Sequence, residues 1–248
     1  MIDTMKRYEV KYLLSPEQTK AFEKGLKGYM ELDRYGLTTI LSLYYDTPDC
    51  RLIRTSIDKP LFKEKLRLRS YGLAKADGPV YLEIKRKACG LVYKRRVGST
   101  QVGVDRFFEK RANLGEGQIA KELISFRDQY ETLRPNCLIA YDRKAFYEKE
   151  GDLRLTIDRN PRYRFDELNL GDDHGTSLLG EGETILEIKV QEAMPLWLTH
   201  LLDELKIYPA SFSKYGEAYK RELALLERKE KPCLHPSSLP ATRRLATL

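Results

Sequence analysis

Cysteine and histidine are scarce in this chain, which has four cysteines and three histidines among its 248 residues. These residues are Cys50, Cys89, Cys137, Cys233, His174, His200 and His235. No two cysteines form a CxxC pair, and the histidines form no HExxH motif. The spacing excludes the common zinc sites and a disulfide framework, so we expect a reducing compartment.

Long apolar runs are also missing. No stretch approaches the roughly 18 apolar residues that a membrane-spanning helix needs. Residues 1–7 include Lys6 and Arg7 but no apolar segment of the kind found in signal peptides. We therefore expect a cytoplasmic protein without a membrane span, whose membrane partner, if it has one, is a separate chain.

Basic residues outnumber acidic ones: 44 Lys and Arg stand against 37 Asp and Glu, which gives a net charge of +7. Such an excess favours anionic partners, for example nucleotides, polyphosphate or nucleic acid. Hydrophobic residues make up 42% of the chain, an ordinary proportion for a globular protein, so the composition excludes a wholly disordered chain.

Alternation of apolar and polar residues is the dominant pattern, and it predicts strands with one apolar and one charged face. Five segments show it: 5–13, 63–70, 80–87, 152–158 and 183–190. Three further runs are also predicted to be strands: 39–46, 91–97 and 137–147. Eight strands are enough to close a barrel. We therefore predict an α+β fold built on a closed, eight-stranded antiparallel β-barrel.

Four helices are predicted, at 16–26, 118–133, 195–205 and 213–229. The first has the clearest start, because Ser15 and Gln18 fit a capping box and Pro16 suits the first turn. Packing the helices outside the barrel would cover the apolar strand faces and leave the charged faces inside. Residues 1–228 are predicted to form one domain, 171–182 a mobile loop, and 229–248 a disordered tail.

Charged residues recur at every second position of the predicted strands. A Glu-Val-Lys or Glu-Ile-Lys triplet occurs at 9–11, 83–85 and 187–189, and Arg67 and Arg69 share a face of another strand. On a single strand such a pattern usually marks a solvated face with cross-strand ion pairs. Inside a barrel, however, like charges about 4 Å apart would cost about 4 kcal/mol at an effective dielectric near 20. An enclosed phosphate chain would relieve that repulsion, since Arg grips phosphate with two parallel hydrogen bonds.

These residues resemble the VTC domain, the polyphosphate polymerase domain of the vacuolar transporter chaperone complex, in its bacterial form. The resemblance spans residues 5 to about 220 and is carried by RYEVKY at 7–12, SLYYD at 42–46, LRLR at 66–69, EIK at 83–85, YDR at 141–143, EIK at 187–189 and FSKY at 212–215. The VTC domain belongs to the triphosphate tunnel metalloenzymes, a CYTH-like superfamily. Membership implies a barrel-shaped tunnel in which ATP donates its γ-phosphate to a growing polyphosphate chain and ADP leaves.

The resemblance also implies roles for individual residues. Catalytic roles at the transferred phosphates are implied for Arg67, Arg69, Lys85, Arg143 and Lys214. Additional phosphate contacts are implied for Arg7, Lys11, Lys94, Arg96, Arg154, Lys189 and Ser213. A divalent metal, Mn²⁺ or Mg²⁺, is implied at Glu187, with Glu9 as a second ligand. Arg7 stands where the CYTH branch has the first acid of its ExExK motif, which points away from the hydrolases of that branch.

Two alternatives stay open from the sequence. The first is a triphosphatase of the same tunnel fold, in which water replaces the phosphate chain as acceptor. The second is a binding module for nucleic acid or another polyanion without enzymatic activity. Base stacking would require aromatic side chains on the charged surface. The aromatic residues fall mostly on the apolar strand faces, so we do not expect nucleic acid to be a partner.

Overall fold

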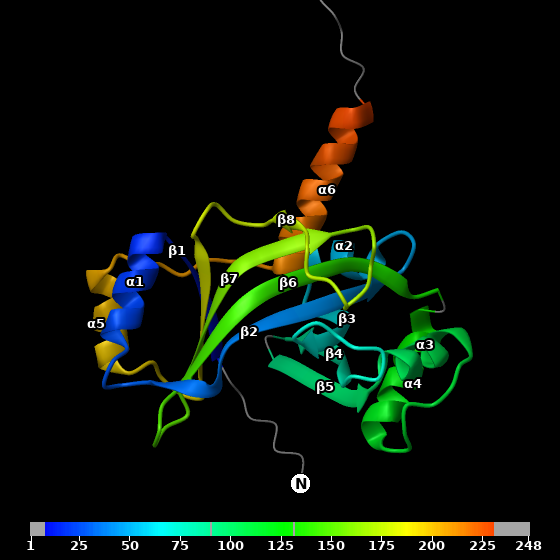
Figure 1. The fold of residues 1–248 in the computed structure, drawn as a ribbon, viewed down its shortest axis with the longest axis horizontal. Coiled ribbons are helices and arrows are strands. Elements are labelled where there is room, and N and C mark those ends of the chain that lie inside the picture. Colours follow the sequence, from blue (N-terminus) through cyan, green and yellow to red (C-terminus); the bar gives the residue numbers. More distant parts are fainter. Residues whose placement is uncertain (1–7, 90, 131, 231–248) are drawn as a thin grey trace, which may run out of the picture.

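A single antiparallel sheet forms the centre of the protein (Figure 1). The computed structural model describes residues 8–89, 91–130 and 132–230. The strands are β1 (Tyr8–Leu14), β2 (Glu31–Asp46), β3 (Phe62–Tyr71), β4 (Val80–Ala88), β5 (Leu91–Ser99), β6 (Arg134–Tyr147), β7 (Arg154–Arg164), β8 (Thr176–Ser177) and β9 (Thr184–Val190). The helices are α1 (Pro16–Gly25), α2 (Arg51–Ile57), α3 (Gln101–Glu109), α4 (Gln118–Tyr130), α5 (Leu196–Glu204) and α6 (Lys214–Glu230). The predicted α+β class is confirmed, and all eight predicted strands are present.

The strand order is β1-β9-β7-β6-β2-β3-β4-β5, with β8 paired to β7. The predicted closure of the barrel is not observed, since β1 and β5 end the sheet and do not pair with each other within the described residues. The sheet nevertheless curves strongly. Glu9 on β1 reaches to 3.7 Å from Lys85 on β4, although five strands lie between them in the sheet. Register shifts in the β2–β6 and β6–β7 pairs mark irregularities of the bulge type that bend strands.

Helices cover the outer face of the sheet at both ends (Figure 1). The apolar residues of β1, β7 and β9, among them Leu155 and Ile188, pack with Phe22 of α1 and Leu198 of α5. The predicted capping box of α1 is confirmed: Ser15 Oγ accepts from Gln18 N at 3.2 Å, and the Gln18 side chain accepts from Ser15 N at 3.0 Å.

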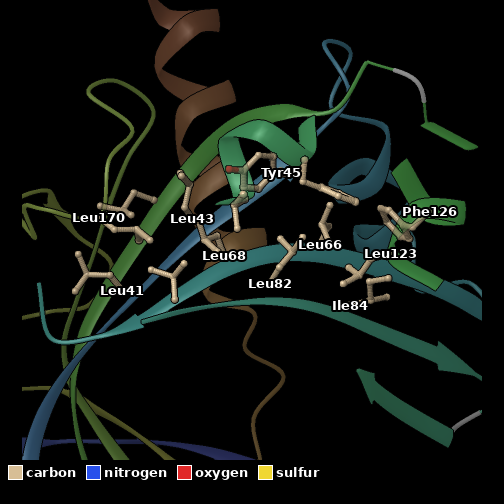
Figure 2. Packing of buried hydrophobic residues seen from close by; sticks show 14 of the residues in the cluster. Leu41, Leu43, Tyr45, Leu66, Leu68, Leu82, Ile84, Leu123, Phe126 and Leu170 are labelled. Carbon is tan, nitrogen blue, oxygen red and sulfur yellow. The ribbon is translucent and has the colours of Figure 1, made fainter. Parts of the chain in front are cut away.

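A second core lies on the outer face of β2, β3 and β4, against α3 and α4 (Figure 2). Leu66, Leu68 and Ile84 are almost fully buried there, beside Leu123 and Phe126 of α4. The alternation therefore predicted correctly that these apolar residues face helices. Their neighbours in the sequence must then point to the inner, concave face of the sheet.

The concave face had been predicted to be polar throughout, and this prediction was wrong. Under α2 and α6 it is apolar, and Tyr44, Tyr141 and Tyr215 form a third core cluster there with Ile53. Neither α2 nor α3 was predicted from the sequence. The N-cap residue of α2, Cys50, has φ +58° and makes no side-chain capping bond, so the usual start signal is absent.

Buried Asp46 anchors both α2 and α6. Its carboxylate accepts hydrogen bonds from the backbone N–H groups of Leu52 and Ile53, at 2.8 and 3.0 Å. It also accepts from the Tyr215 hydroxyl at 2.9 Å. These bonds fix the first turn of α6, and thereby Lys214, against the concave face.

The predicted domain end at 228 and the predicted loop at 171–182 can be compared with the structure. Helix α6 continues through Glu230, past the expected domain end at 228, and the remainder of the predicted tail, 231–248, lies outside the described residues. The loop at 171–182 contains β8, and Arg164 donates hydrogen bonds to the carbonyls of Asp172 and His174. No helix in the described part of the chain is long and apolar enough to cross a membrane.

Candidate functional site

Charged side chains gather on the polar part of the concave face, and we call this set of residues the charged cluster. Its nine basic members are Lys11, Lys65, Arg67, Arg69, Lys85, Lys94, Arg143, Lys189 and Lys214. Its four acidic members are Glu9, Glu83, Asp158 and Glu187. Seven strands and α6 contribute to it, so only the folded chain brings these residues together.

Glu83 on β4 is the first of three acidic centres in the charged cluster. Only 1% of its side chain is exposed, and Arg67 Nε lies 2.8 Å from it, Lys94 Nζ 2.9 Å and Arg69 Nε 3.8 Å. Burial alone would raise the pKa of Glu83, but Arg67, Arg69 and Lys94 outweigh burial and lower that pKa to about 2. Glu83 is therefore ionised and holds the two arginines in place. No role of its own was predicted for Glu83 from the sequence.

Asp158 on β7 is the second acidic centre and is fully buried. Arg143 of β6 donates two hydrogen bonds to its oxygens, at 2.6 and 2.8 Å, and Lys214 of α6 donates a third. Burial opposes ionisation of Asp158, yet Lys214 and Arg143 hold its pKa below the ordinary value. This carboxylate joins β6, β7 and α6, and it was missed in the sequence although it lies in the alternating pattern of β7.

Glu9 and Glu187 form the third acidic centre, from the paired strands β1 and β9. Lys11 lies between them, 3.5 Å from Glu9 and 4.0 Å from Glu187. Glu187 also pairs with Lys189. Although burial would raise the pKa of Glu187, Lys189 and Lys11 lower it strongly, so the group is an anion over the whole neutral range.

Tyr44 and Tyr141 lie on the same face as the cations, contrary to the expectation that aromatic residues avoid this face. Arg67 donates to the Tyr44 hydroxyl at 3.4 Å and Arg69 to the Tyr141 hydroxyl at 3.3 Å. Burial would raise the pKa of Tyr141, but Arg143 and Arg69 lower it to about 8. Both rings are buried, at 9% and 4% exposure, so they support the arginines and cannot stack on bases.

Most of the residues predicted for the site come together in the charged cluster. Arg67, Arg69, Lys85, Arg143 and Lys214 all belong to it, as do Lys11, Lys94, Lys189, Glu9 and Glu187. Ser213 borders it, since its hydroxyl accepts a hydrogen bond from Lys65 at 3.0 Å.

Three predicted residues do not join the network of ion pairs. Arg154 bends toward the β6–β7 turn, where it donates to the carbonyls of Gly151 and Leu153 and lies over the Tyr147 ring. Its guanidinium is thereby directed away from the predicted phosphate path. Arg96 stacks over Tyr81 with its guanidinium carbon 5.0 Å from the ring centre. Arg7 lies outside the described residues.

A metal ion fits beside Glu187 only if phosphate and water complete its coordination. The described residues contain no group of three or more His, Cys, Asp or Glu side chains that could hold a metal. Glu187 and Glu9 supply two carboxylates, a number compatible with Mg²⁺ or Mn²⁺ bound to phosphates. Thr156 faces Glu187 in the β7–β9 register, and its buried Oγ1 lacks a hydrogen-bond partner within the described structure. That orphaned hydroxyl is a further polar group for a ligand at this point.

The fold is shared with solved structures of low sequence identity. A candidate adenylate cyclase from Bacillus halodurans has a TM-score of 0.54 and 14% identity, over 84% of this chain and 96% of that one. A candidate adenylate cyclase from Vibrio parahaemolyticus has a TM-score of 0.46 and 13% identity, over 90% and 99% of the two chains. The PH1819 protein from Pyrococcus horikoshii has a TM-score of 0.46 and 14% identity, over 87% and 99%. At these identities the likeness concerns the fold alone.

The described part of the chain thus combines a strongly curved antiparallel sheet with charged residues on its inner face. Comparison with curated proteins gives no match. The sequence profile of the VTC domain, however, matches residues 6–223, which is most of the chain. The chain therefore belongs to the VTC domain family.

Proposed function

We propose that this protein is a metal-dependent polyphosphate polymerase that transfers the γ-phosphate of ATP to a growing polyphosphate chain and releases ADP. The observation that carries the proposal is the charge imbalance of the charged cluster, where, among the described residues, nine basic groups meet four carboxylates. Removing that many cations from bulk water is unfavourable unless anions join them. A chain of phosphates supplies one negative charge at each step along the cluster.

In the proposed reaction, Arg67 and Arg69 bind the phosphates of the nucleotide, held in place by Glu83. Lys85, Arg143 and Lys214 surround the transferred group from three other elements. Lys11, Lys94, Lys189 and Ser213 would bind the remaining phosphates. Phosphoryl transfer spreads charge over the equatorial oxygens, so catalysis consists of positioning the reactants and stabilising that charge. When bound at Glu187, Mn²⁺ or Mg²⁺ would neutralise part of it.

Incubation of the protein with ATP labelled at the γ-phosphate, in the presence of Mn²⁺, tests the proposal. Label in an acid-labile polymer is the expected result. Label in free phosphate would instead identify a triphosphatase of the same fold. Label in pyrophosphate, with formation of unlabelled cyclic AMP, would identify the activity for which two of the structural relatives are named. Either of these outcomes, without polymer, would overturn the polymerase assignment.

Glu187→Gln tests the proposed metal site, because the substitution keeps the shape of the side chain and removes its charge. We expect metal-dependent turnover to fall by at least about 10-fold to 100-fold, the range found when a residue that only orients a metal ligand is removed. Binding of polyphosphate should persist, since the surrounding lysines and arginines are unchanged. The measurement is the initial rate as a function of Mn²⁺ concentration, together with polyphosphate affinity without metal.

A matched control is Glu23→Gln, which removes a carboxylate that pairs with Lys144 and Arg159 outside the charged cluster. That variant should keep the Mn²⁺ dependence of the wild type. If Glu187→Gln also keeps it, Glu187 only balances Lys11 and Lys189, and the metal assignment is wrong.

Binding competition addresses a non-enzymatic role in nucleic-acid recognition. Polyphosphate and single-stranded DNA of equal charge are titrated at several salt concentrations. We expect polyphosphate to bind more tightly at every concentration, because the aromatic rings beside the cations are buried. Tighter binding of DNA would contradict this expectation.

A further inference from the structure

Lys65 of β3 is the basic member of the charged cluster that differs most from the rest. Among the described residues no carboxylate lies within ion-pair distance of its amino group, whereas Arg67, Arg143 and Lys214 each have one. Its hydrogen-bond partner is the uncharged hydroxyl of Ser213, at 3.0 Å. The amino group of Lys65 is thus a partly buried cation that no carboxylate of the described residues neutralises.

The groups that face Lys65 from neighbouring elements add positive charge. Lys11 approaches from β1 and Lys85 from β4, while Lys63 and Arg67 lie on its own strand. Helix α6 contributes only Ser213 at its start and the face of the Tyr215 ring, 5.9 Å from the amino group. Glu9 of β1 lies 3.7 Å from Lys85 and 3.5 Å from Lys11, but no carboxylate of the described residues lies within ion-pair distance of Lys65 itself.

This environment disfavours the protonated amine. Burial, reinforced by Lys85 and Lys11, lowers the pKa of Lys65 from 10.5 to about 7. Above that pH the amino group is mostly neutral in the ligand-free protein. A phosphate group placed among Lys65, Lys85 and Ser213 would favour the charged form again, because an opposite charge at close range stabilises the ammonium ion.

We propose that Lys65 is a further phosphate-binding residue of the charged cluster, and that polyphosphate binding is coupled to the uptake of a proton by its amino group. The inference rests on the proposed function, since it requires a phosphate chain on the concave face. The proton comes from solvent and leaves when the anion leaves. Affinity for polyphosphate then declines as the pH rises above about 7, by up to about tenfold per unit if the proton is fully linked.

Calorimetric titration with long-chain inorganic polyphosphate, without ATP or metal, measures this coupling. Repeating the titration in buffers of different ionisation enthalpy, about one pH unit above the pKa of Lys65, gives the number of protons taken up. Internal phosphates of a long chain stay ionised at this pH, so they contribute little. The wild-type protein should take up close to one proton more than the variant Lys65→Arg, whose guanidinium is always charged.

Lys65→Arg should bind polyphosphate with an affinity that falls less steeply across this pH range than the affinity of wild type. Lys65→Met should bind more weakly below pH 7 and should lose the same part of the proton uptake. The pKa values of Lys85 and Lys94 are also lowered by burial, and the pKa of Tyr141 is lowered to about 8, so the difference between wild type and Lys65→Arg is the decisive quantity. Lys24→Met, at an exposed position on α1 outside the concave face, is the matched control and should behave as wild type.

Stability of the ligand-free protein provides a second measurement. A lysine with a depressed pKa in the folded state binds fewer protons than in the unfolded state, so its cost to folding grows as the pH falls from 10.5 to about 7 and is complete below that. Lys65→Met should therefore raise the unfolding temperature near pH 7, and the gain should shrink toward pH 10.5.

The outcomes separate the hypothesis of proton coupling at Lys65 from the hypothesis that the protein is a polyphosphate polymerase. If wild-type protein does not bind polyphosphate at all, the proposed function fails and the coupling fails with it. If polyphosphate binds but wild type and Lys65→Arg take up equal numbers of protons, Lys65 is not the coupled group and the polymerase proposal stands.

Discussion

Replacing Arg67 or Arg69 by alanine is expected to abolish phosphoryl transfer while leaving the fold intact. Each guanidinium is aimed at the concave face by the almost fully buried Glu83 and by a tyrosine hydroxyl, so its position is fixed before substrate binds. Preorganised donors of this kind act on the charge that develops in the transition state, and the loss of one costs about 10²–10³-fold in rate. The rate of polymer formation from labelled ATP measures the effect.

Stability should change little in these variants, because Glu83 keeps two of its three basic neighbours after either substitution. Thermal unfolding without ligand verifies this point. Arg67→Lys should show an intermediate rate, since it retains the charge but loses the planar fork. Arg95→Ala is the control: Arg95 lies on β5 but pairs with Glu122 on the outer side, and its loss should leave transfer unchanged. Full activity in Arg67→Ala would remove this arginine from the proposed mechanism.

Asp158→Asn is expected to have the largest effect on stability. The substitution leaves Arg143 and Lys214 partly buried without their counter-ion, and breaking such a pair typically costs about 3–5 kcal/mol. Urea denaturation measures the free energy of unfolding. Addition of polyphosphate should stabilise the variant more than it stabilises wild type, because phosphate then compensates the two cations. If the pair were purely structural, polyphosphate would raise the stability of both proteins equally.

Asp128→Asn serves as the control for Asp158, because its carboxylate is nearly half exposed, although it pairs with exposed Arg111 and with buried Arg127. An exposed carboxylate contributes far less to the free energy of unfolding than a buried one, because solvent screens its charge. The contribution of Asp158 to the stability of the protein depends on pH with a definite sign. Since the folded pKa of Asp158 lies below 3.8, its stabilisation is present above that pH and is lost as the pH falls through the folded value. An Asp158→Asn variant as stable as wild type would show that neighbouring carboxylates replace it.

The two faces of the sheet could be predicted from the sequence, because side chains alternate strictly along a strand. Leu66 and Leu68 were correctly assigned to the side of the helices, and Arg67 and Arg69 to the opposite side. Helix α1 was also predictable, since its capping box is encoded within four residues. These features depend on near neighbours in the chain.

Contacts between distant segments could not be predicted in the same way. Asp158, Arg143 and Lys214 come from three elements, and only the strand order and the anchoring of α6 bring them together. The alternation shows that Glu83 and Lys85 share a face, but it does not show which cations reach Glu83. Among the described residues Lys65 has no carboxylate partner, and this too is a property of the assembled sheet. The position of Tyr141 beside the arginines is another such property.

The gap between β1 and β5 affects how a long polymer could reach the charged cluster. If backbone hydrogen bonds closed the sheet into a barrel, polyphosphate would have to enter the barrel with one of its ends first. Within the described residues, one contact that crosses this interruption is the ion pair of Glu9 with Lys85, whose side chains are partly exposed. Salt screens such a pair, and both side chains can rotate away without disturbing the sheet. An internal segment of polyphosphate would then enter the charged cluster directly. Chemical blocking of the two ends of the polymer would therefore not prevent binding.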